Sequence, residues 1–335
     1  MTTIQDVAKK AQVSVATVSR VINHSKNVSQ HTREAVEAAI AELHYVPNML
    51  GMNLRKNETK KILVLLDTIS NQFYSRVTAG IEQRAAKDGY IVMLGCTRSS
   101  LETEDSYLQM LRTRLVDGII LLSCQNDAVS LQQKLSGQLA VLACETVDGS
   151  ELPFIGIDNE RAAFDAVNFL IGCGKRRIAF FGAGDQYSSS RLRYIGYQRA
   201  LQQNSILLEP AIIYQDGFSY QAGMRCAQKL LRSNPDRLPD AIFALSDSCA
   251  IGAVKLLHEK GYSVPGDISV MGFDNTRNAR MVLPEITTVA QPQKEIGYRA
   301  ADTLIGMLQG NPGEGALLAH EIIKRNSVSE TDIEG

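Results

Sequence analysis

The spacing of apolar residues changes near residue 60. Before that point, apolar side chains recur every three or four residues in three short segments, and each segment follows a hydroxyl residue able to cap a helix: Thr3, Ser14 and Ser29. This pattern predicts three short helices, of which the second runs from Ser14 through Asn23. A proline then interrupts the pattern, and residues 48–56 are expected to form one more short helix before a polar stretch.

Beyond residue 60, continuous apolar runs alternate with amphipathic segments. Such alternation is typical of parallel strands covered by helices on both faces. Strands are expected over 62–66, 91–94, 118–122, 139–143, 154–157, 177–181, 241–245, 268–272 and 286–290. Helices are expected in the intervening segments, such as 75–88, 104–115, 162–172, 220–232 and 249–260. This number of strands is large for a single open sheet, which favours two doubly wound lobes.

Length and composition narrow the class of protein. A chain of 335 residues is long enough for two or three domains. No window approaches twenty uninterrupted apolar residues, and the first residues lack the basic-then-apolar pattern of a secretory signal, so we expect a cytoplasmic protein. The six cysteines are scattered without a C-x-x-C pair, which favours free thiols over a zinc site or a disulfide framework.

Charge is distributed unevenly along the chain. Residues 1–60 contain eight Lys or Arg and five Asp or Glu, whereas the whole chain has a net charge of −1. A basic head on an acidic body is consistent with a nucleic-acid contact at one end, although a solvated basic face has the same composition. The exposed positions expected on the second helix include Val15, Ala16 and Arg20: two short side chains that permit close approach and an arginine able to read guanine.

Enzyme motifs are incomplete in this sequence. Gly182-Ala-Gly184 lacks the third glycine of a dinucleotide fingerprint, and Gly172-Cys-Gly-Lys175 is followed by Arg176 where a phosphate loop needs Ser or Thr. There is no G-x-S-x-G elbow, and the five histidines form no cluster of ligands. We therefore expect no catalytic activity, no cofactor and no metal.

The two-helix fragment at residues 6–23 resembles the DNA-binding motif of the LacI/GalR family. The resemblance extends over nearly the whole chain, through Val-Ser-x-x-Thr-Arg at 28–33, Glu-Leu-His-Tyr-Val-Pro at 42–47, Val-Asp-Gly-Ile-Ile at 116–120, Ile-Asp-Asn at 157–159, Ser-Asp-Ser-Cys-Ala at 246–250, Pro-Gly-Asp-Ile-Ser-Val-Met-Gly-Phe-Asp-Asn at 265–275 and Leu-Pro-Glu-Ile-Thr-Thr-Val at 283–289. Within the family, the stretches 55–62 and 152–168 are most similar to the cytidine-responsive repressor.

The resemblance implies an all-α helix-turn-helix head with a hinge helix, followed by an α/β core of two doubly wound lobes like the type I periplasmic binding proteins. The implied domains are a DNA-binding domain at 1–46, a hinge helix and linker at 47–60, and an effector-binding and dimerisation domain at 61–335. Its lobes are expected at roughly 61–160 plus 290–320 and 161–289 plus 321–330.

The resemblance also assigns roles in operator binding. Val15, Ala16 and Arg20 match base-reading positions, and Leu54 matches a wedge in the minor groove, with packing in the linker as its alternative. Contacts to the DNA backbone are expected from Ser14, Thr17, Asn23, Ser29, Thr32 and Arg55.

Effector contacts are implied at eight positions: Phe73, Tyr74, Cys144, Asp158, Arg193, Phe218, Asp247 and Asp274. Asp158 is equally able to line the cleft or to cap a helix, and the variable segment 184–190 gives no contact that can be carried over. The expected effector is a nucleoside such as cytidine, with a pentose or hexose as the alternative. The partners expected are a pseudo-palindromic operator and a second copy of the chain; the rival class is an extracytoplasmic solute-binding protein. The sequence leaves open whether the effector releases or promotes DNA binding.

Overall fold

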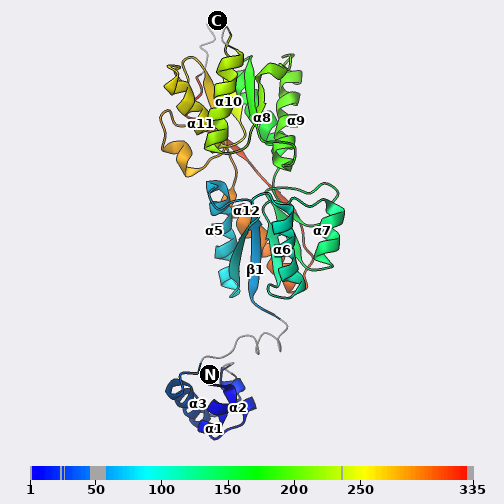
Figure 1. The fold of residues 1–335 in the computed structure, drawn as a ribbon, viewed down its shortest axis with the longest axis vertical. Helices are drawn as coiled ribbons and strands as arrows, with labels where there is room; N and C mark the ends of the chain where they lie inside the picture. The colour runs from blue at the N-terminus through cyan, green and yellow to red at the C-terminus, as the bar shows by residue number, and fades with distance from the viewer. Residues whose placement is uncertain (1, 23–24, 26, 46–57, 235–236, 330–335) are drawn as a thin grey trace. The chain divides into compact units, whose positions relative to one another are not determined.

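The computed structural model describes residues 2–22, 25, 27–45, 58–234 and 237–329. The chain forms two compact units, Met1–Thr59 and Lys60–Gly335 (Figure 1). Within the described residues, no helix combines the length and apolar character needed to cross a bilayer.

The first unit contains three helices, α1 (Ile4–Lys10), α2 (Val15–Ile22) and α3 (Gln30–Glu42). Thr3 caps α1 in a capping box with Asp6, since the Thr3 side chain accepts from the Asp6 amide and the Asp6 carboxylate accepts from the Thr3 amide. The three helices share one small core of Val7, Ala8, Val18, Val21, Val36, Ala39 and Tyr45. The three predicted helices and their caps are confirmed. The expected hinge helix lies outside the described residues.

The second unit contains two six-stranded sheets. The first sheet has the order β11-β5-β4-β3-β1-β2, and all of its pairs are parallel. Its strands are β1 (Lys61–Leu66), β2 (Ile91–Cys96), β3 (Gly118–Leu121), β4 (Ala140–Ala143), β5 (Phe154–Ile157) and β11 (Ala316–Leu318). Its helices are α5 (Gln72–Lys87), α6 (Leu101–Arg112), α7 (Ala128–Leu135) and α12 (Gln293–Leu308). These elements form the first lobe.

The second sheet has the order β12-β10-β9-β8-β6-β7, with a single antiparallel pair between β10 and β12. Its strands are β6 (Ile178–Gly182), β7 (Ile213–Gln215), β8 (Ala241–Ala244), β9 (Ser269–Asp274), β10 (Thr287–Ala290) and β12 (Glu321–Ile323). Its helices are α8 (Asn159–Gly172), α9 (Ser188–Gln203), α10 (Tyr220–Ser233) and α11 (Asp247–Glu259), with short 3-10 turns η1 (Pro210–Ile212) and η2 (Arg277–Arg280). These elements form the second lobe.

The chain passes between the lobes three times: after β5, after β10 and between β11 and β12. All nine strands expected from the apolar runs are present, with ends shifted by one or two residues. Strands β7, β11 and β12 were not predicted. They are only three residues long and half-buried, so they carry no continuous apolar run.

Helices cover both faces of each sheet in pairs, as Figure 1 shows for α8 and α9 on one side of the second lobe and α10 and α11 on the other. In β1, Ile62, Val64 and Leu66 pack into one core while Leu63 and Leu65 pack into another. A strand buried on both faces has no alternation of apolar and polar residues, which explains why the sequence shows it as a continuous run.

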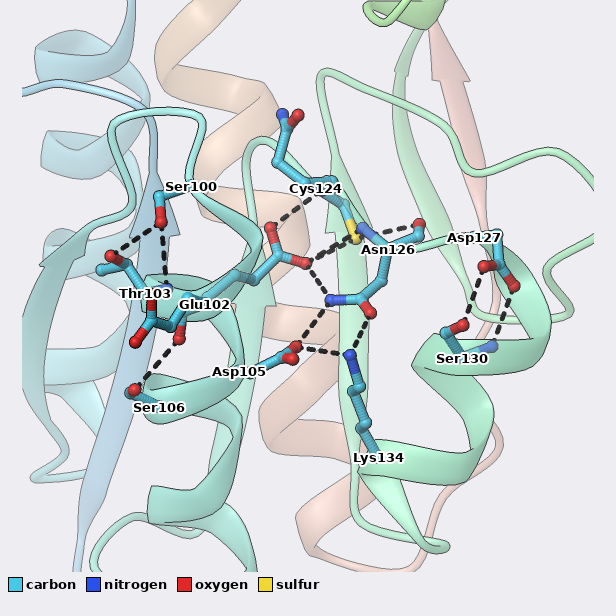
Figure 2. Close-up of polar contacts among 12 residues, drawn as sticks. Ser100, Glu102, Thr103, Asp105, Ser106, Cys124, Asn126, Asp127, Ser130 and Lys134 are labelled. Carbon is cyan, nitrogen blue, oxygen red and sulfur yellow. Dashed lines mark hydrogen bonds and ion pairs between the residues drawn. The ribbon is translucent and has the colours of Figure 1, made fainter.

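A buried carboxylate stabilises the first lobe (Figure 2). Glu104 of α6 is fully buried and accepts hydrogen bonds from the Gln125 and Asn126 amides, the Asn126 side chain and the Cys124 thiol. These bonds join α6 to the loop between β3 and α7. Every partner belongs to the first lobe, so we assign this cluster a structural role.

Candidate DNA-binding surface and effector site

Helix α2 exposes the residues expected to read bases. Val18 and Val21 are buried in the core of the head, whereas Ala16 and Arg20 are exposed and Val15 is half-buried. Ala16 and Arg20 therefore lie on the exposed side of the helix, in its first and last turns, whereas Val15 packs at the edge of the core. Such a surface admits close approach of a duplex because two of its side chains are short.

The four hydroxyls expected at the DNA backbone form two helix caps. Ser14 Oγ accepts from the Thr17 amide and lies 2.9 Å from the Thr17 hydroxyl, and Ser29 Oγ makes the same pair of contacts with Thr32. The caps mark the amino-terminal ends of α2 and α3, where the helix dipole favours a phosphate. Asn23, Leu54 and Arg55 lie outside the described residues.

Between the lobes, five of the expected effector residues lie close together. Phe73 and Tyr74 begin α5, Cys144 follows β4, Arg193 lies in α9 and Asp274 ends β9. All five are less than 10% exposed. Tyr74, Cys144 and Asp274 each act electrostatically on Arg193, as does Glu145. The structure thus brings together side chains from positions up to 201 residues apart in the sequence.

Arg193 is the buried cation of this cluster. Its guanidinium donates to the Asn159 side chain at 2.9 Å and to the Leu245 carbonyl at 2.6 Å, and it stacks on the Phe273 ring with 3.6 Å to the centroid. Burial lowers the pKa of Arg193, while the neighbouring Asp274 and Glu145 carboxylates oppose that effect. A second hydrogen-bonding edge of the guanidinium remains for a ligand oxygen.

Asp274 is the principal acceptor. It has a positive φ of 106°, and its carboxylate accepts from the Gln291 side chain at 2.7 Å while its carbonyl accepts from Gln293. Burial raises the pKa of Asp274 to about 8, against the opposing effect of Arg193. With that pKa the Asp274 side chain is largely protonated at neutral pH, so it offers a ligand hydroxyl both a donor and an acceptor.

Glu145, the neighbour of Cys144, is a functional candidate that was not among the expected effector contacts. It follows β4 in the first lobe, and its carboxylate accepts from the Ser188 hydroxyl at 2.7 Å, from the Ser189 amide at 2.8 Å and from the Ser189 hydroxyl. Tyr187, the N-cap residue of α9, provides no side-chain cap of its own. Glu145 therefore caps a helix of the other lobe. The one available signal was the row of three serines in the segment set aside as variable.

Two further contacts join the lobes around this cap. The Tyr187 hydroxyl lies 3.0 Å from Ser99 of the first lobe, and Arg191 forms an ion pair with Asp148 at 2.6 Å. Phe218 meets the Tyr187 ring edge to face, with 5.2 Å between centroids. The expected effector residue Phe218 is therefore placed beside the cluster through Tyr187.

Two expected effector residues have structural partners. Asp158 is exposed and caps α8 by accepting from the Arg161 amide at 2.9 Å, which is one of the two roles considered for it. Asp247 is fully buried, and its carboxylate accepts from the Thr276 amide, the Thr276 hydroxyl and the Thr288 hydroxyl. With three donors already in place, Asp247 fixes the segment that follows Asp274.

A helix-turn-helix head joined to a two-lobed unit with a charged cluster between its lobes defines the class of ligand-controlled DNA-binding regulators. Residues 3–48 match the model for bacterial regulatory proteins of the lacI family, and residues 167–328 match that for a periplasmic binding protein-like domain. The chain is 37% identical to the transcriptional repressor CytR of Escherichia coli K12 over 97% of its length and 96% of that protein. The chain belongs to the LacI family of bacterial regulatory proteins.

Other relatives share the full length. The ribose operon repressor of Haemophilus influenzae is 33% identical over 94% of each chain. The lac repressor dimer bound to operator and the anti-inducer ONPF superimposes with a TM-score of 0.88 at 29% identity, covering 98% of this chain and 99% of the other. The resemblance to the LacI/GalR family and the expected fold class are confirmed.

Proposed function

We propose that the chain is a cytoplasmic, homodimeric repressor that reads a pseudo-palindromic operator through α2 and answers to a nucleoside held between its lobes. The observation that carries the proposal is the buried cluster around Arg193 and Asp274, in the same chain as a helix-turn-helix head. In this account Val15, Ala16 and Arg20 read bases, and the capped ends of α2 and α3 contact phosphates.

The charges of the cluster favour a neutral ligand with several donors. Glu145 offsets the charge of the one guanidinium, that of Arg193, and Asp274 with its raised pKa adds little charge at neutral pH. A ribose offers hydroxyls to Asp274, and a base carbonyl accepts from Arg193. The rings of Phe73, Tyr74 and Phe218 supply apolar surface for a flat base.

A pentose or hexose is the second candidate. It uses the same carboxylates but has no base to stack, and relatives of this chain include a ribose operon repressor and a regulator solved as its cellobiose complex. The similarity of residues 152–168 to the cytidine-responsive repressor favours the nucleoside. That segment includes Asn159, which holds Arg193 in place.

Dimerisation is supported by apolar side chains that are left exposed. Ile91 and Leu94 lie on β2, an edge strand, and Met281 and Leu283 follow η2 in the second lobe. Leu283 is 85% exposed. Exposed apolar residues on an edge strand are typical of a subunit contact. A symmetric dimer also presents two DNA-binding heads to the two half-sites of an operator.

Calorimetric titration of the full-length protein tests the effector. We expect cytidine to bind more tightly than ribose, Phe218→Ala to weaken cytidine more than ribose, and Asp274→Ala to weaken both by about 1–3 kcal/mol because ligand hydroxyls lose their acceptor. Binding of ribose or another sugar, with no binding of cytidine, adenosine or uridine at millimolar concentration, refutes the nucleoside proposal.

A further inference from the structure

Phe273 lies against the buried cation of the effector cluster. The Cζ atom of Arg193 lies 3.6 Å from the centroid of the Phe273 ring, so the guanidinium covers one face of that ring. Phe273 is fully buried and belongs to β9, next to Asp274. A guanidinium is attracted to the electron-rich face of a ring, and the attraction is stronger where water is excluded. Phe273 therefore restrains the plane of the Arg193 guanidinium.

Two hydrogen bonds fix the guanidinium further. Its Nε atom donates to Asn159 Oδ1 at 2.9 Å, and its Nη1 atom donates to the Leu245 carbonyl at 2.6 Å. Asn159 begins α8 and Leu245 follows β8, so both acceptors belong to the second lobe. Phe273 and Arg193 belong to the same lobe. The lobe that carries the arginine thus supplies all three restraints, and none of them depends on the first lobe.

These restraints leave one edge of the guanidinium unused. An arginine has five N–H donors, and among the described residues Arg193 donates only to Asn159 and Leu245. The Nη2 atom and the second N–H of Nη1 remain for a ligand oxygen. Because the guanidinium is already fixed, a ligand that meets this edge pays little for ordering it.

The ring of Phe273 is itself held by other aromatic rings. Its centroid lies 6.5 Å from that of Phe243, and the Phe243 centroid lies 6.1 Å from that of Phe180 in β6. Phe180 packs on Tyr197 with 5.1 Å between centroids, and the Tyr197 hydroxyl donates to the Ile178 carbonyl at 2.8 Å. All four rings are fully buried. A ring in such a packed column cannot turn away from the guanidinium without displacing its neighbours.

We propose that Phe273 is a positioning residue that gives the effector site its preference for a ligand with a planar carbonyl group. Phe273 acts through Arg193, because it holds the unused edge of the guanidinium in one orientation. A carbonyl oxygen accepts best near its own plane, so it gains from a donor edge of fixed orientation. A sugar hydroxyl rotates to suit its partner and gains less. The inference rests on the proposed nucleoside-binding function, and it names the residue that separates ligands with a base from ligands without one.

The first test needs no ligand and uses NMR spectra of the 15N-labelled full-length protein. A guanidinium held at three points rotates slowly and lies in the shielding region of the ring, so the Arg193 signals are resolved and displaced. R193K identifies them by removing them. We expect F273L, or F273M if F273L does not fold, to shift or merge these signals. Unchanged Arg193 signals overturn the positioning role.

F181L is the matched control. Phe181 is fully buried in β6 of the same sheet, but it packs into a different core from Phe273, against Tyr214. The substitution removes a buried ring of the same size without touching Arg193. We expect F181L to leave the Arg193 signals unchanged. Equal changes in F181L and F273L assign Phe273 a general packing role and overturn the proposal.

Calorimetric titration of the same full-length variants tests the preference. We expect F273L to raise the Kd for cytidine about tenfold and the Kd for ribose less, whereas F181L changes neither. F273L/R193K should bind cytidine no more weakly than R193K alone, because the ring acts through the guanidinium.

Two titration results overturn the proposal: equal losses for cytidine and ribose in F273L, or losses that multiply in F273L/R193K. A wild-type protein that binds ribose but not cytidine refutes the proposed function, and the preference assigned to Phe273 falls with it. Unchanged Arg193 signals in an F273L protein whose wild type binds cytidine refute only the role of Phe273.

Discussion

Glu145 joins the lobes through a helix cap. The cap is formed by a carboxylate from the first lobe and the amino-terminal end of α9 in the second, so it exists only while these segments are in contact. Residues that make such contacts bear directly on the arrangement of the lobes, and hence on any signal between the effector and the DNA.

Replacing Glu145 by alanine should destabilise the second unit by about 1–3 kcal/mol, because the buried Ser188 and Ser189 groups lose their acceptor. Chemical denaturation of the full-length protein measures the loss. The control is Asp148→Asn, which breaks the exposed ion pair to Arg191 and should cost less than about 1 kcal/mol. Equal losses in the two variants contradict the role assigned to Glu145.

Asp274 makes the stability of the folded protein depend on pH. Burial raises the pKa of Asp274 to about 8, above its unfolded value of about 4, so the folded state binds the proton more tightly. The stabilising contribution of that proton is complete below about pH 4 and is lost as the pH rises to about 8. Asp274→Asn removes this titration.

The free energy of unfolding of Asp274→Asn, relative to wild type, should therefore increase between pH 4 and pH 8, by on the order of 5 kcal/mol, since each pH unit between the two pKa values contributes about 1.4 kcal/mol. Asp216→Asn is the control: hydrogen bonds from Arg225 lower the pKa of Asp216, so its contribution to stability changes mainly below about pH 4 and is nearly constant between pH 4 and pH 8. Parallel stability curves for Asp274→Asn and wild type over this range are the result that refutes the assignment.

Glycines set the distance between paired helices. In the α10–α11 pair, a Cβ on Gly252 lies 2.0 Å from the Tyr220 carbonyl oxygen, and one on Gly223 lies 1.9 Å from the Cys249 carbonyl oxygen. Backbone atoms at that distance cannot yield without separating the helices. The same close approach occurs between α5 and α12 at Gly80.

Gly252→Ala should lower the free energy of unfolding by about 1–3 kcal/mol or more through overpacking. Gly172→Ala is the matched control, because a Cβ there meets no atom within 4 Å. That control should be neutral or stabilising by about 0.5–1 kcal/mol. Thermal or urea unfolding of both variants distinguishes overpacking from a general intolerance of alanine, which predicts equal losses.

The sequence predicts best the helices and strands whose apolar spacing and caps lie within their own residues. The strand at 62–66 is a continuous apolar run, and the helix after Ser29 has its cap and its apolar spacing within 14 residues. Helix α9 was not among the helices named from the sequence, and its first turn consists of three serines that face a carboxylate 43 or more residues away. Short strands such as β11 depend on a neighbour distant in sequence, so their own residues carry little signal.

The site shows the same division. The family resemblance implied effector contacts at Phe73, Tyr74, Arg193 and Asp274, and the structure brings these residues together. It also implied a contact at Asp158, which caps helix α8 in the structure. The contact made by Glu145 was not predicted, because a single glutamate after a strand has no distinguishing pattern. Its role as a cap depends on the contact with α9, a helix of the other lobe.

The proposed dimer can be tested through its exposed apolar residues. Leu283→Asp should weaken self-association by placing a charge in the contact, and sedimentation velocity at micromolar concentration measures the change. Leu207→Asp is the control, because Leu207 is 88% exposed in the loop after α9 and is not part of the proposed contact. A wild-type protein that sediments as a monomer, or equal effects of both substitutions, contradicts the proposed dimer.

The measurement closest to the central claim is the affinity of the full-length protein for duplexes selected from random DNA, with and without cytidine. The account predicts a selected site with two half-sites related by a dyad, and a change in Kd of at least about fivefold when cytidine, but not ribose, is added. Arg20→Ala should relax selectivity at one base pair in each half-site, at a cost of about 1–3 kcal/mol. Selected sites without a dyad, or an affinity that cytidine leaves unchanged, would contradict it.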